Sequence, residues 1–267
     1  MAYQLIIIGG GRMGSALATG LVRAGWSSEG LCVVESSLEQ RDALVEQLPG
    51  VALRATLELA DVDELTGAVL CVKPDQAEGA ARLAGACGVT RLLSVVAGLA
   101  TARLEAAFAT PVAVVRSMPN TPVLVGRGVS AIAGGSHVTR ADLDWAESVL
   151  GAVGTVVRVS ERHLDAVTGL SGSGPAYLYL VVEAMIEAGV HQGLTREVSR
   201  ELVVGTFEGS AALLRASGES PEELRAQVTS PGGTTAAGLR MLEGRAVRAA
   251  FLEAVAAATE RSRQLGR

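Results

Sequence analysis

Up to about residue 160, short runs of apolar and β-branched residues alternate with stretches of helical periodicity. Four of these runs are continuously apolar, as expected of strands that helices cover on both faces. The repeated strand–helix order predicts an α/β fold with a doubly wound, mostly parallel sheet. The runs occupy residues 5–8, 31–34, 68–72, 92–96, 112–115, 129–133 and 156–159.

The pattern changes after Glu161, where strand signals nearly vanish and apolar residues recur at helical spacing. A last run from Arg245 to about Leu265 predicts one more long helix. We therefore expect an α/β domain over residues 1–160 and an all-α domain over residues 161–267. The helices of the second domain are apolar over much of their circumference, and so small a domain has a small core. Helices of a second subunit are expected to bury the remaining apolar surface.

Composition narrows the class of protein. With 49% hydrophobic and 19% charged residues and a mean hydropathy of +0.35, the chain can bury a sizeable core. Its longest apolar runs, such as residues 178–182, fall far short of the ~20 residues that span a bilayer, and without a charged and then apolar start we expect no leader. A net charge of −5 without a basic run argues against nucleic acid as a partner. Cys32, Cys71 and Cys87 form no C-x-x-C pair, which favours a cytoplasmic protein with buried thiols.

A glycine-rich turn follows the run at residues 5–8 directly, and a helical pattern follows the turn. Gly9, Gly11 and Gly14 satisfy the pattern G-x-G-x-x-G in the strand–turn–helix order that a dinucleotide requires. The glycines permit a tight turn and a close backbone approach to the pyrophosphate, which the helix N-terminus faces. A glycine-rich turn without a ligand is the alternative. The expected cofactor contacts here are Gly9, Gly11, Arg12, Met13 and Gly14.

Glu35 follows the second strand, about 20 residues after the last glycine, where an acidic residue binds the ribose 2′-hydroxyl. A carboxylate there repels a 2′-phosphate, so the sequence favours NADH. Ser36, Ser37 and Arg41 lie just beyond and could solvate a phosphate if Glu35 turned away. The expected cofactor is therefore NAD(P)H, with a preference for NADH.

Three more segments follow predicted strands at the edge where open α/β sheets bind ligands. They are Cys71-Val72-Lys73-Pro74, the segment 94–99 and the proline-containing segment 116–122. Lys73 is the only lysine of the chain, and lysine, unlike arginine, can donate a proton near neutral pH when its pKa is lowered. A surface lysine at a strand end is the alternative.

The all-α part contains two turns of small residues that open helices, at residues 168–177 and 230–235. Backbone N–H groups and hydroxyls at a helix N-terminus bind anions without a formal positive charge. The two turns therefore suggest a small carboxylate as substrate, with plain helix capping as the alternative.

These segments together resemble the pyrroline-5-carboxylate reductase family over nearly the whole chain. The resemblance implies a Rossmann N-terminal domain and a helical C-terminal dimerisation domain. It also implies a homodimer with interleaved C-terminal helices and an active site at the subunit interface. Such dimers can associate into a larger assembly. The activity implied is transfer of hydride from NAD(P)H to the C=N carbon of 1-pyrroline-5-carboxylate, giving L-proline. The segments are residues 9–14, 72–74, 97–98, 118–122, 168–177 and 228–235.

By the same resemblance, the turn that ends at Thr235 would hold the substrate carboxylate. The hydroxyl of Thr235 would lie near the ring nitrogen, and Thr168 would line the pocket, so both are the expected catalytic residues. The remaining substrate contacts would be Ser230, Gly232, Gly233 and Thr234. Further cofactor contacts would come from Ser36, Val72, Lys73, Pro74, Ala97, Gly98 and Asn120.

The chain departs from the family pattern on the cofactor side. Arg12 stands where asparagine is usual, and Glu35-Ser36-Ser37 replaces an Asn-Arg-Ser or Asp-Arg-Ser end of the second strand. An asparagine that often contacts the adenosine side is replaced around Ala55 and Thr56. These changes put a preference for NADPH in doubt and leave the substrate segments intact.

A protonated cyclic imine is already a strong electrophile, so its reduction requires positioning more than acid–base catalysis. This agrees with a site that contains no His–Asp pair and no expected metal ligands. A β-hydroxyacid dehydrogenase is one alternative, but it needs a basic lysine in the helical domain, and no lysine follows Lys73. A non-enzymatic dinucleotide sensor is the other, and it gives no reason for the turn at residues 230–235.

Overall fold

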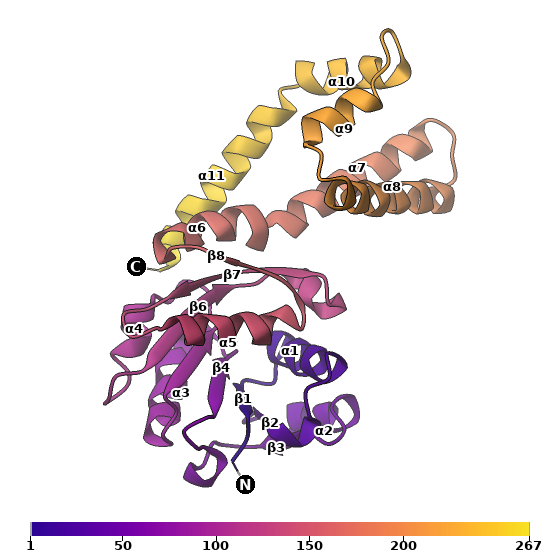
Figure 1. Cartoon of the computed structure of the whole chain (residues 1–267). Helices are drawn as coiled ribbons and strands as arrows, with labels where there is room; N and C mark the ends of the chain where they lie inside the picture. The colour runs from indigo at the N-terminus through magenta and orange to yellow at the C-terminus, as the bar shows by residue number, and fades with distance from the viewer. Residues whose placement is uncertain (1, 267) are drawn as a thin grey trace. The chain divides into compact units, whose positions relative to one another are not determined.

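The computed structural model describes residues 2–266, which form two compact units. The first unit holds the residues up to Ser173 together with those from Ala257 onward, and the second is Gly174–Ala256. The two units are defined by how compactly the chain packs and not by function. The functional boundary predicted near Ser160 therefore stays a prediction. Figure 1 shows the sheet of the first unit and the helices of the second.

The described part of the first unit contains an eight-stranded sheet with the order β3-β2-β1-β4-β5-β6-β7-β8. All neighbouring strands are parallel except β6 and β7, which are antiparallel. The predicted α/β class with a mostly parallel sheet is confirmed. The strands are β1 Leu5–Ile8, β2 Leu31–Val34, β3 Ala52–Arg54, β4 Gly67–Leu70, β5 Arg91–Ser94, β6 Ala113–Met118, β7 Gly128–Gly134 and β8 Gly154–Arg158.

Helices cover both faces of the sheet. This explains why the sequence of β1 is continuously apolar and does not alternate between apolar and polar residues. Leu5 and Ile7 belong to one hydrophobic cluster, whereas Ile6 and Ile8 belong to another. Because successive side chains of a strand point to opposite faces, each face of β1 is buried in its own core. The helices of this unit are α1 Arg12–Arg23, α2 Leu38–Gln47, α3 Pro74–Ala86, α4 Thr101–Glu105, α5 Arg140–Gly151 and α6 Leu164–Val167.

Short 3₁₀ and π segments complete the first unit. The 3₁₀ segments are η1 Ser28–Gly30, η2 Leu59–Asp61, η3 Thr121–Val125 and η4 Glu161–His163, and the π segment is η5 Thr168–Gly172.

The structure corrects several sequence-based strand predictions. Strand β3 was not predicted, because its three residues lie at the sheet edge and form no apolar run. The strands predicted at 68–72 and 92–96 end earlier, at Leu70 and Ser94. Their extended backbone still continues for one further bond, from Cys71 N to Ile8 O at 2.8 Å and from Val95 N to Leu70 O at 3.1 Å.

The other predicted strands differ at their ends. Those expected at 112–115, 129–133 and 156–159 are found as β6, β7 and β8 with shifted bounds. Strands β6 and β7 pair antiparallel because the segment between them contains only η3, whereas a parallel pair needs a longer crossover.

The second unit is helical, with α7 Gly174–His191, α8 Arg196–Ser217, α9 Pro221–Gln227, α10 Thr234–Gly244 and the first part of α11 Val247–Leu265. Helix α11 begins at Val247 rather than at Arg245, because Ala246 adopts a left-handed conformation with φ 55° and separates it from α10. In the part of the chain that the structure describes, no helix has the length and apolar character needed to cross a membrane.

The single chain leaves much of this apolar helical surface open. Helix α7 buries none of its residues, although it carries a long series of apolar side chains. Exposed apolar surface on this scale indicates a contact with another protein surface. More than half of the residue surface is exposed at Leu178, Leu180, Leu202, Leu213, Met241 and Leu252.

Leu93 offers a test of the core that the structure assigns to the sheet. Its side chain is fully buried in β5, so Leu93→Ala is expected to lower the free energy of unfolding by about 2–5 kcal/mol. Leu59→Ala is the control, because Leu59 is 71% exposed, and its change is expected to stay within about 0.5 kcal/mol. Chemical denaturation of the two variants measures both values, and equal losses would contradict the assigned core.

Candidate functional site

The turn after β1 forms an uncapped helix N-terminus at the carboxyl edge of the sheet. Gly11 is the N-cap residue of α1, and no side chain caps this end of the helix. The first backbone N–H groups of a helix have no partner inside the helix, and the helix dipole makes this end electropositive. A helix N-terminus of this kind can bind an anion.

The three motif glycines are needed for different reasons. A Cβ on Gly9 would lie 2.7 Å from Cys71 O, and a Cβ on Gly14 would lie 1.9 Å from Gly9 O. Both positions are therefore closed to any side chain by the protein itself. A Cβ on Gly11 would meet no protein atom within 4 Å. The open space at Gly11, in front of the helix terminus, fits a dinucleotide pyrophosphate.

Glu35 connects the end of β2 to this turn. Its Oε2 accepts a hydrogen bond from Gly10 N at 2.9 Å, and its Oε1 accepts one from Ser37 N at 2.9 Å. The Gln40 side-chain amide donates to Gly10 O at 3.2 Å. Arg41 Nη1 donates to the backbone oxygens of Glu35 and Ser36, at 2.6 and 2.9 Å. The carboxylate thus faces the glycine turn, and the Arg41 guanidinium is held on backbone beside the exposed Ser36.

The segments after β4 and β5 lie at the same edge. Lys73 is the N-cap residue of α3, exposed to solvent, and Pro74 opens that helix. Ala97 is exposed, and Gly98 has a left-handed φ of 74°. Burial raises the pKa of the Cys71 thiol to about 12, so this cysteine stays a neutral thiol beside the site.

The segment after β6 contacts the π segment η5. The side-chain amide of Asn120 donates to Ser171 O at 3.3 Å and to Ser171 Oγ at 3.4 Å. Its Oδ1 accepts from Val129 N at 2.9 Å. Thr168, the first residue of η5, donates its hydroxyl to Leu164 O at 2.9 Å. The structure therefore brings Thr168 and Asn120 onto neighbouring segments.

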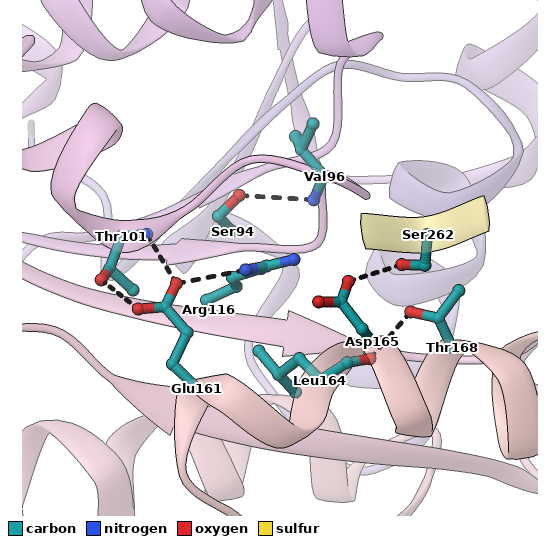
Figure 2. A network of polar contacts seen from close by, with 9 residues as sticks. All are labelled: Ser94, Val96, Thr101, Arg116, Glu161, Leu164, Asp165, Thr168 and Ser262. Atoms are coloured by element: carbon teal, nitrogen blue, oxygen red, sulfur yellow. Dashed lines mark hydrogen bonds and ion pairs between the residues drawn. The ribbon is translucent and has the colours of Figure 1, made fainter. Parts of the chain in front are cut away.

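Two further polar groups fix the surrounding loops (Figure 2). Glu161 accepts from Thr101 N and Thr101 Oγ1, both at 2.8 Å, and from Arg116 Nη1 at 3.2 Å. Burial raises the pKa of Glu161, but the hydrogen bonds from Thr101 and Arg116 outweigh it and hold the pKa below its ordinary value. Ser262 Oγ donates to Asp165 Oδ1 at 2.7 Å, which attaches the end of α11 to α6.

Sequence reasoning missed these positioning groups and Gln40. The bonded residues are 60 positions apart for Thr101 and Glu161 and 97 positions apart for Asp165 and Ser262. No local pattern marks such pairs, so only the fold reveals them.

The predicted substrate turn lies in the second unit, at the start of α10. Gly233 is the N-cap residue, its N donates to Ser230 O at 3.0 Å, and no side chain caps the helix. A Cβ on Gly233 would lie 2.4 Å from Ser230 Oγ, and Gly232 has a left-handed φ of 69°. Thr234 and Thr235 are the first helical residues. The turn thus combines an open helix N-terminus with three hydroxyl side chains.

The predicted site residues therefore form two groups, each within one unit. The dinucleotide turn, Glu35, the segments after β4 and β5, Asn120 and Thr168 belong to the first unit, and the turn at residues 230–235 belongs to the second. Among the described residues, no cluster of three or more His, Cys, Asp or Glu side chains could hold a metal ion.

The fold and the glycine turn define a dinucleotide-binding oxidoreductase of the Rossmann type. Residues 4–98 match the family model described as NADP oxidoreductase coenzyme F420-dependent. Residues 161–265 match the family model for pyrroline-5-carboxylate reductase dimerisation.

Similar proteins narrow this class. The chain is 40% identical to a pyrroline-5-carboxylate reductase of Corynebacterium melassecola over 98% of each chain. A solved pyrroline-5-carboxylate reductase of Coxiella burnetii matches it with a TM-score of 0.92 and 32% identity over 100% of both chains. The pyrroline carboxylate reductase of Plasmodium falciparum, solved with NADP bound, matches it with a TM-score of 0.84 and 32% identity over 98% of both chains.

The chain belongs to the pyrroline-5-carboxylate reductase family. The predicted family and the predicted oxidoreductase class are confirmed. The comparisons support a pyridine nucleotide as cofactor and a homo-oligomer as the assembly.

Gly11 offers a test of the dinucleotide turn that separates binding from folding. Gly11→Ala adds a methyl group where no protein atom lies within 4 Å, so we expect the thermal stability to be kept and the NAD(P)H dissociation constant to rise at least about tenfold. Gly79→Ala is the matched control, because its Cβ also meets nothing and it lies in α3. Fluorescence titration with NADH and NADPH measures the affinity, and unchanged binding by Gly11→Ala would remove the turn from the cofactor site.

Proposed function

We propose that this chain reduces 1-pyrroline-5-carboxylate to L-proline with NAD(P)H. Membership of the reductase family over the full chain length carries the proposal. Bound nicotinamide supplies the hydride, and the protein has to hold the imine carbon within about 3–3.5 Å of it. Turnover of racemic pyrroline-5-carboxylate, followed by NAD(P)H oxidation, tests the proposal. A folded protein that binds nucleotide without any turnover would contradict it.

The turn at the start of α10 is suited to the substrate carboxylate. Its open helix terminus offers N–H donors and a positive dipole end, and Ser230, Thr234 and Thr235 add hydroxyl donors. We assign the orientation of the ring nitrogen to the Thr235 hydroxyl and a place in the pocket wall to Thr168. These hydroxyls can hold and relay a proton without a dedicated acid–base pair.

The remaining features fit this reaction better than the alternatives. A hydroxyacid dehydrogenase would need a lysine base in the helical part, and the chain has no lysine beyond Lys73. A nucleotide sensor would have no use for a second open helix terminus with three hydroxyls.

We further propose that the helices of Gly174–Ala256 interleave with those of a second copy. The exposed apolar side chains of α7, α8 and α10 support this, because a second copy presents the same surface. Dimers of this kind can associate further. The free cysteines Cys32, Cys71 and Cys87 favour a cytoplasmic location.

We also propose NADH as the preferred cofactor. The Glu35 carboxylate is held at the end of β2 by two backbone N–H groups, where it meets the adenosine ribose of a bound dinucleotide. Its orientation towards the glycine turn supports NADH, because Ser36, Ser37 and Arg41 would solvate a phosphate only if Glu35 turned away. A 2′-phosphate would be placed close to this negative charge.

Glu35→Gln tests this preference, since it keeps the shape and removes the charge. We expect wild-type protein to have the higher kcat/KM with NADH, and the variant to shift the NADPH to NADH ratio about tenfold towards NADPH. Glu39→Gln is the matched control, because Glu39 carries the same charge in the exposed first turn of α2. Steady-state kinetics with both cofactors decides: a wild-type preference for NADPH, or a ratio that Glu35→Gln leaves unmoved, would refute the assignment.

Thr235 tests the assigned proton path. Thr235→Ala is expected to lower kcat by about tenfold to a hundredfold at unchanged fold and unchanged NAD(P)H affinity. Thr235→Ser keeps the hydroxyl and is expected to retain most of the activity. Turnover of Thr235→Ala at the wild-type rate would exclude the hydroxyl from the reaction.

A further inference from the structure

We propose that Asn120 is a positioning residue that holds the π segment η5, and with it Thr168, in the shape that receives the imine. Asn120 is the only asparagine in the chain. The family resemblance makes it an expected cofactor contact, whereas its hydrogen bonds in the structure support a different role. The inference rests on the proposed function, in which Thr168 lines the substrate pocket.

All the hydrogen-bonding atoms of the Asn120 side chain are engaged within the first unit. Its Nδ2 donates to both oxygens of Ser171, and its Oδ1 accepts from Val129 N at the start of β7. The amide therefore connects η5 to the sheet through two strands. A residue that contacted the nucleotide with this amide would have to give up one of these bonds.

The Asn120 amide gives the Ser171 carbonyl a hydrogen-bond donor in place of a helical N–H that this sequence lacks. In an α-helix that carbonyl would accept the N–H of the residue four positions later, which is Pro175 and has no N–H. The segment widens instead into a π turn, in which Ser173 N donates to Thr168 O at 2.8 Å. The Asn120 amide supplies a donor to the carbonyl at this point.

Packing fixes the same two segments against each other. A Cβ on Gly172 would lie 2.5 Å from Met118 Cε, so η5 packs directly against the end of the Met118 side chain from β6. Pro119 stands between Met118 and Asn120 and restricts the backbone there. The Asn120 amide therefore joins a stiff segment to η5. The first residue of η5, Thr168, donates its hydroxyl to Leu164 O.

Asn120→Asp is the sharpest test, because it keeps the shape and the acceptor for Val129 N while it replaces the donor by a negative oxygen next to Ser171 O. We expect kcat/KM for the imine to fall about tenfold or more, with the NAD(P)H dissociation constant within about twofold of wild type. Ser171→Ala removes only one of the two acceptors, so a smaller loss of the same kind is expected.

Gln40→Glu is the matched control. Its side-chain amide also donates to a backbone carbonyl, that of Gly10, but in the dinucleotide turn. We expect the opposite split from this variant: weaker NAD(P)H binding with an unchanged KM for the imine. If the two variants merely lost stability, one would not affect the imine alone while the other affected NAD(P)H binding alone.

Hydrogen–deuterium exchange gives a readout that does not depend on turnover. Backbone amides of residues 168–173 are expected to exchange at least about tenfold faster in Asn120→Asp than in wild type, and at the wild-type rate in Gln40→Glu. If wild-type protein reduced no imine, the proposed function would fail. Hydrogen exchange and nucleotide titration would still show whether Asn120 holds η5 or contacts the nucleotide.

Either of two results would overturn the proposed positioning role of Asn120. The first is a tenfold loss of NAD(P)H affinity in Asn120→Asp with an intact KM for the imine, which would make Asn120 a cofactor ligand. The second is wild-type kinetics and wild-type exchange in that variant, which would leave the amide without a role in the site.

Discussion

The close approach of Gly14 to the carbonyl of Gly9 sets the position of the whole dinucleotide site. Because the two backbones nearly touch, α1 begins directly over the end of β1 and its N-terminus opens onto the carboxyl edge of the sheet. Burial of β1 on both faces makes this placement rigid. Glu35 is then held beside the turn by the backbone of Gly10, so its negative charge has a fixed place next to the glycines.

The polar groups around the site form a supporting layer more than a set of reactive groups. Glu161 ties α4 and β6 together, Ser262 ties α11 to α6, and Asn120 ties η5 to the sheet. Each spans segments that are far apart in the sequence. The proposed reduction of an activated imine would require accurate placement above all, and a layer of this kind can support it.

The sequence predicted the elements whose signal is local. The apolar run of β1, the glycine turn and the opening of a helix within residues 230–235 were found where expected, because each depends on neighbouring residues alone. Strand β3 was missed because an edge strand of three residues has no apolar pattern. The partners of Asn120 and Asp165 could not be predicted, since their bonds depend on how the fold brings distant segments together.

The return of the last residues to the first unit has a consequence for how the protein is made. Helix α11 ends among residues of the first unit, where Ser262 bonds to Asp165 and the backbone of Gly266 lies against that of Gly98. The contacts between α11 and the rest of the first unit therefore cannot form until α11 has left the ribosome. The sheet can assemble as soon as its strands have been synthesised, but the loop at Gly98 acquires its neighbour from the end of α11 only after the helices of Gly174–Ala256 have been synthesised as well.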